Sequence, residues 1–143
     1  MALIVQKFGG TSVGSIERIQ AVADKVIKSR KQGHQIVVVV SAMSGETDRL
    51  LGLSGEISSQ VSKRELDVLL STGEQVTIAL LSMALEAKGC AAESFTGGQV
   101  CILTDSVHSK ARIMEIDAQR ESKALEDEKV VAVAGFQGID ADG

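Results

Sequence analysis

A lysine, two adjacent glycines and several hydroxyl side chains follow one another near the start of the chain, in the segment KFGGTSVGS (residues 7–15). Paired glycines let backbone N–H groups approach an anion without an intervening Cβ, and a following helix would point its positive end at the same place. Lys7, Gly9 and Gly10 are therefore candidates for binding a phosphate group. A P-loop has its lysine after the glycines, so this order excludes that motif. A strand-to-helix turn that uses glycine for steric reasons is an alternative interpretation.

A second polar segment, SAMSGETD (residues 41–48), follows an unbroken β-branched run at residues 37–40. Such a run predicts a strand buried on both faces. Ligands of open α/β sheets lie beyond the carboxyl ends of the strands, so Ser41 and the turn after it are expected where a substrate would bind. Thr47 or Asp48 is expected to cap the next helix, and capping is the simpler role for Ser44 and Asp48.

A third segment, ELDVLLSTGEQ (residues 65–75), contains Glu74 directly after a Ser-Thr-Gly sequence. We expect these three residues to form a turn between helices at 63–70 and 74–88, which would place Glu74 in the first turn of the second helix. The helix macrodipole would stabilise a carboxylate there by about 0.3–1 kcal/mol, which is a sufficient structural reason for a glutamate. A fourth segment, AGFQG (residues 134–138), ends an apolar run, and the default role of its Phe136 is in the core.

These four segments resemble the aspartokinases of the amino-acid kinase family. KFGGTSVGS resembles the opening of these enzymes, and residues 41–48 resemble their S-A-M-[GS]-x-x-T-[DN] segment. ELDVLLSTGEQ resembles their E-L-D-x-L-x-S-T-G-E-Q signature, and AGFQG their A-G-F-Q-G segment. The resemblance implies that the transferred phosphate is contacted by a lysine, a glycine pair and a serine, here Lys7, Gly9, Gly10 and Ser41.

The same resemblance implies a site for L-aspartate formed by Thr47, Glu74 and Phe136. L-Aspartate carries an α-ammonium group, and a buried pocket must offer that cation an anionic partner, which Glu74 can supply. Glutamate kinases and kinases of N-acetylglutamate, carbamate and uridylate share the fold. The S-T-G-E-Q segment argues against the last three, because N-acetylglutamate, carbamate and UMP lack the free amino group that its glutamate would bind.

The implied reaction is the ATP-dependent phosphorylation of the β-carboxylate of L-aspartate, with Mg²⁺ bridging the phosphates. It is the first step in making the aspartate-family amino acids, including lysine, threonine and methionine. In such enzymes a nucleotide-binding half and ACT regulatory domains follow the A-G-F-Q-G segment, so residues 1–143 correspond to the N-terminal, substrate-binding part of the catalytic domain. We expect a homo-oligomer for the complete enzyme and no turnover by this part alone. Alternatives are an isolated binding or assembly fragment, or another kinase such as glutamate 5-kinase.

Composition restricts the function further. The chain of 143 residues has a formal net charge of −4 and no basic run, which argues against a nucleic-acid partner. No apolar run in the sequence approaches the ~20 residues that cross a bilayer, so we expect no membrane span and no signal peptide. Cys90 and Cys101 fit no metal-ligand spacing, which predicts free thiols, no metal site and a cytoplasmic location. His34 and His108 have no partner at a motif spacing and are interpreted as surface or structural residues.

The elements that must position these residues alternate between strand and helix. This alternation predicts an α/β fold, a three-layer α/β/α sandwich with a mainly parallel sheet. Ser15 is the expected N-cap of the first long helix, and Gly33 and Gly89 are expected to end helices. The serine-rich residues 54–62 are expected to form a loop, a lid or an irregular helix. Strands are expected near the start of the chain and at 35–40, 91–95, 100–104 and 130–134, and further helices at 47–53 and 117–125.

Overall fold

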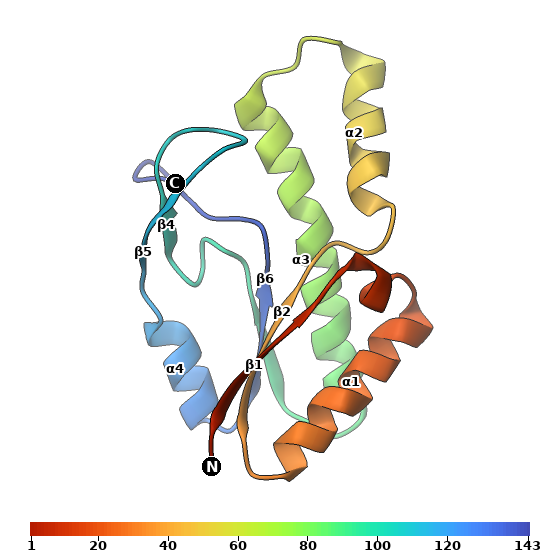
Figure 1. The fold of residues 1–143 in the computed structure, drawn as a ribbon, viewed down its shortest axis with the longest axis vertical. Helices are drawn as coiled ribbons and strands as arrows, with labels where there is room; N and C mark the ends of the chain where they lie inside the picture. Colours follow the sequence, from red (N-terminus) through yellow and green to blue (C-terminus); the bar gives the residue numbers. More distant parts are fainter.

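The computed structural model describes all 143 residues and alternates strands with helices along the chain (Figure 1). The strands are β1 (Leu3–Phe8), β2 (Gln35–Val40), β3 (Ala92–Phe95), β4 (Ile102–Thr104), β5 (Ile113–Ile116) and β6 (Val130–Ala134). The helices are the short 3₁₀ helix η1 (Gly10–Val13) and the α-helices α1 (Ile16–Lys31), α2 (Glu46–Ile57), α3 (Lys63–Ala87) and α4 (Gln119–Glu126).

Four strands form one parallel sheet in the order β1-β2-β6-β3. Phe8 lies opposite Val40, and Val40 lies opposite Ala134, so the carboxyl ends of three neighbouring strands meet at one edge of the sheet. All five residues of β6 are buried, as the continuous apolar run predicts for a strand covered on both faces. The polar segments after β1, β2 and β6 are thereby brought to the same edge.

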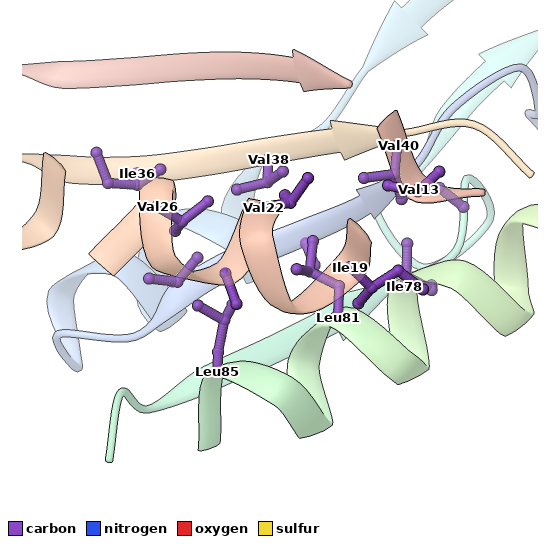
Figure 2. Close-up of a cluster of buried hydrophobic side chains, with 14 residues drawn as sticks. Val13, Ile19, Val22, Val26, Ile36, Val38, Val40, Ile78, Leu81 and Leu85 are labelled. Atoms are coloured by element: carbon purple, nitrogen blue, oxygen red, sulfur yellow. The ribbon is translucent and has the colours of Figure 1, made fainter. Parts of the chain in front are cut away.

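The sheet is covered on both faces, which confirms the three-layer fold class. On one face α1 and α3 pack over an aliphatic core that includes Val22, Val38, Leu81 and Leu85 (Figure 2). On the other face α4 packs a smaller cluster against β6 and β3. The core contains almost no aromatic side chains, in keeping with an aromatic content of 2%.

A two-stranded antiparallel sheet of β4 and β5 lies outside the parallel sheet. The expected strand at 100–104 is present in shorter form as β4, whereas the sequence did not predict β5. All four residues of β5 are exposed. A strand with no buried face needs no alternation of apolar and polar residues, and its sequence IMEI shows none. Residues 135–139 return beside β4 after β6, and Leu103 pairs with Ile139 in a single parallel bridge.

The prediction of a turn between helices at 63–70 and 74–88 is wrong, because α3 is continuous from Lys63 to Ala87. The hydroxyls of Ser71 and Thr72 donate to the carbonyls of Val68 and Leu69, at 2.8 and 2.7 Å, and so are satisfied within the helix. Glu74 lies in the middle of α3, and the macrodipole of a helix start gives no reason for it there. A different constraint explains Gly73: an added Cβ would lie 2.9 Å from the Cβ of Ala42.

The start of α2 also differs from the expectation. Its N-cap is Gly45, with a φ of +80° that glycine adopts without strain, and Thr47 and Asp48 lie inside the first turn instead of capping it. The helix continues to Ile57, so the first half of the serine-rich stretch is regular helix. The predicted caps at the other helices are confirmed: Ser15 accepts a hydrogen bond from the N–H of Arg18 at 3.2 Å, and Gly33 and Gly89 have positive φ.

The continuity of α3 affects one further expectation. At 25 residues it is long and apolar enough, by length and composition, to cross a membrane, although the sequence predicted no such stretch. One face of α3 packs against α1 and the sheet, and a buried core helix passes the same test. Its length is therefore weak support for a membrane location.

Candidate functional site

A hollow of about 360 Å³ lies beyond the carboxyl ends of β1, β2 and β6. Its wall includes six of the seven residues that the sequence singled out, and Gly9 is the one that does not line it. The six are Lys7, Gly10, Ser41, Thr47, Glu74 and Phe136. They come from the four polar segments of the chain, which the parallel register and the packing of α2 and α3 bring together.

The side of the hollow near β1 carries a free cation. Lys7, the last but one residue of β1, is exposed, and no carboxylate lies within ion-pair distance of it. Gly10 lies close to the segment after β2, because an added Cβ would be 3.0 Å from the carbonyl oxygen of Ala42. Ser41 extends the sheet by one residue, since its N–H donates to the carbonyl of Phe8 at 3.2 Å.

A short helix that the sequence did not predict separates the glycine pair from the expected long helix. The four-residue 3₁₀ helix η1 follows Gly9 directly, with the N–H of Ser12 donating to the carbonyl of Gly9 at 3.0 Å. The first α-helix begins only at Ile16. The backbone N–H groups next to the glycines therefore belong to a tight turn, and the dipole of α1 starts further along the chain.

Glu74 also lines the hollow and is buried, with only 7% of its surface exposed. Burial raises the pKa of its carboxyl group, and hydrogen bonding from the backbone amides of Glu74 and Ala42 partly opposes that rise. No lysine, arginine or histidine pairs with it. A buried carboxylate without a cation is costly, so this site favours a ligand that supplies a positive group.

The lining of the hollow therefore includes an unpaired cation and an unpaired buried carboxylate. A ligand that carries both a negative and a positive group could satisfy the two at once. Thr47, in the first turn of α2, also lines the hollow and adds a hydroxyl to it. This arrangement fits a small dipolar molecule better than an apolar one.

Phe136 is not a core residue, contrary to its default role. It is 98% exposed, lines the hollow and has a φ of +59°, a left-handed conformation that is strained for a side chain of this size. Gly135 precedes it and passes close to β2, because an added Cβ would lie 3.1 Å from the carbonyl oxygen of Val40. The chain thus leaves β6 in a sharp turn that presents Phe136 at the mouth of the hollow.

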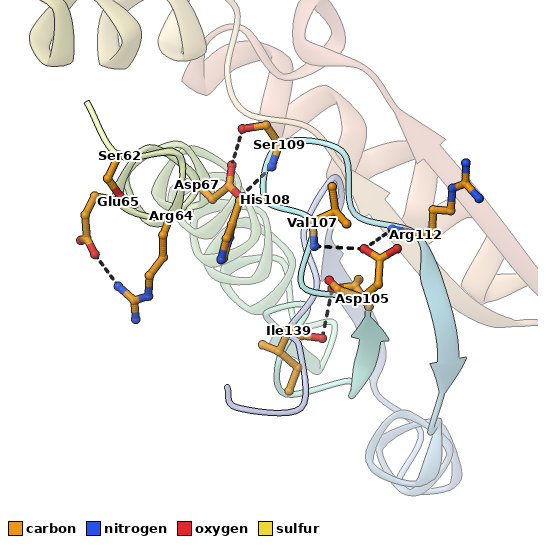
Figure 3. Close-up of polar contacts among 11 residues, drawn as sticks. Ser62, Arg64, Glu65, Asp67, Asp105, Val107, His108, Ser109, Arg112 and Ile139 are labelled. Carbon is orange, nitrogen blue, oxygen red and sulfur yellow. Dashed lines mark hydrogen bonds and ion pairs between the residues drawn. The ribbon is translucent and has the colours of Figure 1, made fainter. Parts of the chain in front are cut away.

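The turn at Ser44 and Gly45 lines the hollow, as expected, but the sequence missed other residues around the site. Met43 also lines the hollow, and so does Asp48, which was expected only to cap a helix. His108 was expected to lack a partner, but its Nδ1 lies 3.2 Å from Oδ2 of Asp67 (Figure 3). The two residues are 41 positions apart, so no local spacing could reveal the pair.

No group of three or more histidine, cysteine, aspartate or glutamate side chains is arranged to hold a metal ion. Both cysteines are free thiols. His34 has a partner near the start of the chain, since its Nδ1 accepts a hydrogen bond from the N–H of Ala2 at 3.3 Å. The charged groups available for ligand binding at the hollow are therefore those of Lys7, Glu74 and Asp48.

Comparison with known sequences decides the family. The sequence profile described as "Amino acid kinase family" matches residues 2–143. This chain belongs to the amino acid kinase family. It is 65% identical over 143 residues to "Aspartate kinase Ask_LysC" of Stutzerimonas stutzeri and 58% identical over 142 residues to "Aspartokinase 2" of Bacillus subtilis. These alignments cover 100% and 99% of this chain but 35% of each relative, so the chain spans about a third of the length of those relatives.

Solved structures agree with this family assignment. The aspartate kinase from Synechocystis matches 96% of the chain and 22% of its own chain, with a TM-score of 0.81 and 49% identity. The complex of E. coli aspartokinase III with aspartate and ADP matches 100% of this chain and 42% of its own, with a TM-score of 0.84. At 21% identity the second match shows the shared amino acid kinase fold.

Proposed function

We propose that this chain is the amino-acid-binding part of the catalytic domain of an aspartate kinase, over residues 1–143. The observation that carries the proposal is the buried, unpaired Glu74 on the wall of a hollow that also contains the free cation of Lys7. The ammonium group of L-aspartate could pair with Glu74, and its carboxylates could lie near Lys7. Relatives of 58–65% identity that bear the names aspartate kinase and aspartokinase support the same substrate.

In the proposed reaction an oxygen of the aspartate β-carboxylate attacks the γ-phosphorus of ATP, and the bond to the ADP oxygen breaks. Such transfer depends on positioning and charge neutralisation more than on acid or base catalysis. Lys7 would stabilise the negative charge on the transferring phosphoryl group, with help from the backbone N–H groups of Gly9 and Gly10 and from Ser41. Glu74 would bind the ammonium group, Thr47 would bind the rest of the amino acid, and Phe136 would border it.

The nucleotide fits only in part within these residues. Lys7 and the turn at Gly9 and Gly10 are suited to its phosphates, and the chain offers no carboxylate cluster for Mg²⁺. ATP would supply the phosphoryl group, and the structure of aspartokinase III with aspartate and ADP supports its use by this family. The complete protein would be a cytoplasmic homo-oligomer in the biosynthesis of lysine, threonine and methionine, with no nucleic-acid or membrane partner.

Calorimetric titration of the 143-residue chain with L-aspartate tests the proposal. Binding of L-aspartate in preference to L-glutamate and N-acetyl-L-aspartate is expected, because acetylation removes the ammonium group that Glu74 would bind. Glu74→Gln should weaken binding about 30-fold or more, the loss typical when one partner of a buried charged pair is removed. Glu86→Gln, on an exposed position of the same helix, is the matched control and should bind normally.

The pH dependence of binding provides an independent check on Glu74. Only the ionised carboxylate attracts the ammonium group, and burial raises the pKa at which Glu74 gains a proton. Affinity should therefore begin to fall, as the pH is lowered, at a pH above the ordinary titration range of a glutamate. In Glu74→Gln this part of the pH dependence should disappear. A folded chain that shows no binding of L-aspartate at any pH would contradict the proposal and favour a purely structural or assembly role.

A further inference from the structure

The side chain of Gln137 connects the segment after β6 to α3 and to the turn at residues 96–98. Its Nε2 donates to the main-chain carbonyl of Ser71 in α3 at 3.1 Å, and its Oε1 accepts from the N–H of Gly97 at 3.3 Å. Both contacts are long-range, spanning 66 and 40 positions of the chain. Gln137 is half-buried and immediately follows Phe136. One amide group thus joins the segment after β6 to the helix that carries Glu74.

Close packing leaves this segment little freedom to move. An added Cβ on Gly97 would lie 2.4 Å from the carbonyl oxygen of Gln137, and one on Gly138 would lie 2.6 Å from Cγ2 of Thr104. The segment therefore fits between the turn at residues 96–98 and β4 without spare space. These contacts fix its backbone from two sides, while the Gln137 amide fixes it relative to α3.

Two features of the hollow depend on where this segment lies. Phe136 has the strained left-handed conformation described above, and such a conformation persists only where the surroundings hold it. Ser71 precedes Glu74 by three residues, so the hydrogen bond to its carbonyl lies within one turn of the buried carboxylate. A shift of the segment would change the separation between Phe136 and Glu74.

We propose that Gln137 is a positioning residue for amino-acid binding: its amide fixes Phe136 at the mouth of the hollow at a set separation from Glu74. This role rests on the proposed function, because it concerns the affinity for L-aspartate. Gln137 lies outside the residues that line the hollow, and it acts through Phe136 and α3. Loss of the amide should weaken binding while leaving the aliphatic core, and hence the folded state, in place.

Gln137→Met removes both hydrogen bonds and keeps the length of the side chain. We expect L-aspartate to bind about tenfold more weakly, as measured by calorimetry. Amide hydrogen exchange should show faster exchange at Gly97, whose N–H loses its acceptor. Gln137→Glu keeps an acceptor for Gly97 but at neutral pH has no donor for the Ser71 carbonyl, so it should protect Gly97 and still bind weakly. Gln75→Met, at an exposed glutamine of α3, is the matched control and should change neither measurement.

A double-mutant cycle separates positioning from a general structural effect. If Gln137 acts through Phe136, then Gln137→Met should cost much less affinity in a Phe136→Ala background than in the wild-type background. Additive losses of affinity in the double mutant would overturn the proposal. Normal affinity of Gln137→Met, together with faster amide exchange at Gly97, would overturn it as well. If the wild-type chain itself fails to bind L-aspartate, the proposed function fails first and the role of Gln137 fails with it. Wild-type binding with an unaffected Gln137→Met contradicts only the role of Gln137.

Discussion

The parallel sheet and the β4–β5 hairpin are stabilised by different kinds of interaction. Every residue of β6 is buried, and the strand is paired on both sides, by β2 and by β3. Every residue of β5 is exposed, and β5 pairs with β4 alone. The hairpin is attached by polar contacts, among them the N–H of Thr104 donating to the carbonyl of Ile139 at 2.7 Å and the contacts of Asp67 with residues 108 and 109 (Figure 3).

This difference divides the candidate site into a part held by the parallel sheet and a part held next to the hairpin. Lys7 lies in β1 and Ser41 directly follows β2, and these two strands pair in parallel register along their whole length. Phe136 lies where the chain leaves β6 for the side of the hairpin. Parts of a protein held by few buried apolar contacts open at lower free energy than the core. We therefore expect mutations in the sheet to change global stability, and mutations around the hairpin to change local opening and ligand binding.

The largest expected effect comes from the core beneath the sheet. Leu81 on α3 is fully buried between α1 and the sheet (Figure 2), so Leu81→Ala should lower the free energy of unfolding by about 2–5 kcal/mol. Ile113→Ala, on the 62% exposed side chain in β5, should cost less than about 1 kcal/mol. Urea denaturation of the two variants measures the contrast. Equal losses would show that the hairpin is as tightly packed as the core.

A smaller effect is expected at the contact between α3 and the turn after β2. An added Cβ at Gly73 would meet the Cβ of Ala42 at 2.9 Å, so Gly73→Ala should destabilise the fold by about 1–3 kcal/mol. The matched control is Gly52→Ala in α2, where an added Cβ meets nothing within 4 Å; this change should stabilise the helix by about 0.5–1 kcal/mol. Thermal unfolding should move the two midpoints in opposite directions. A stabilised Gly73→Ala variant would contradict the close-packing role.

The same glycine shows where the sequence is informative and where it is not. Strand and helix alternation predicts the parallel sheet because each element there buries an apolar face, which leaves a periodic pattern. Ser71, Thr72 and Gly73 form a turn-like sequence with no such pattern, and their helical state depends on packing against Ala42, 31 positions before Gly73. Local composition cannot report a contact over that distance.

The candidate site follows the same division. Lys7, Ser41 and Glu74 were predicted because they stand in distinctive motifs, and the sheet register brings the first two to one edge. Asp67 and Gln137 were missed because their partners lie in distant segments: residues 108 and 109 for Asp67, and Ser71 and Gly97 for Gln137. A glutamine or an aspartate without a local partner looks like an ordinary surface residue in the sequence. Only the fold shows that each one joins two separate elements.

The smallest effect on global stability, and the most local, is expected at Asp67. Its Oδ2 accepts from the N–H of Ser109 at 2.9 Å and lies 3.2 Å from Nδ1 of His108, both in the loop between β4 and β5 (Figure 3). Asp67→Ala removes these acceptors, but the side chains are over a third exposed, so water can replace them. We expect a loss of less than about 1 kcal/mol in the free energy of unfolding, together with about tenfold faster amide exchange at Ser109.

Asp24→Ala provides the comparison for Asp67, because Asp24 pairs on the surface with Lys88 and has no contact with the hairpin. It should cost a similar small free energy of unfolding without changing exchange at Ser109. If Asp67→Ala also left the exchange rate at Ser109 unchanged, the loop between β4 and β5 would be held by its own backbone contacts. The hairpin would then be more rigid than its exposure suggests. If Ser109 exchanges faster while the core amides of β6 keep their protection, the sheet and the hairpin open independently. In that case opening of the hairpin loop would leave the strands that carry Lys7 and Ser41 in place.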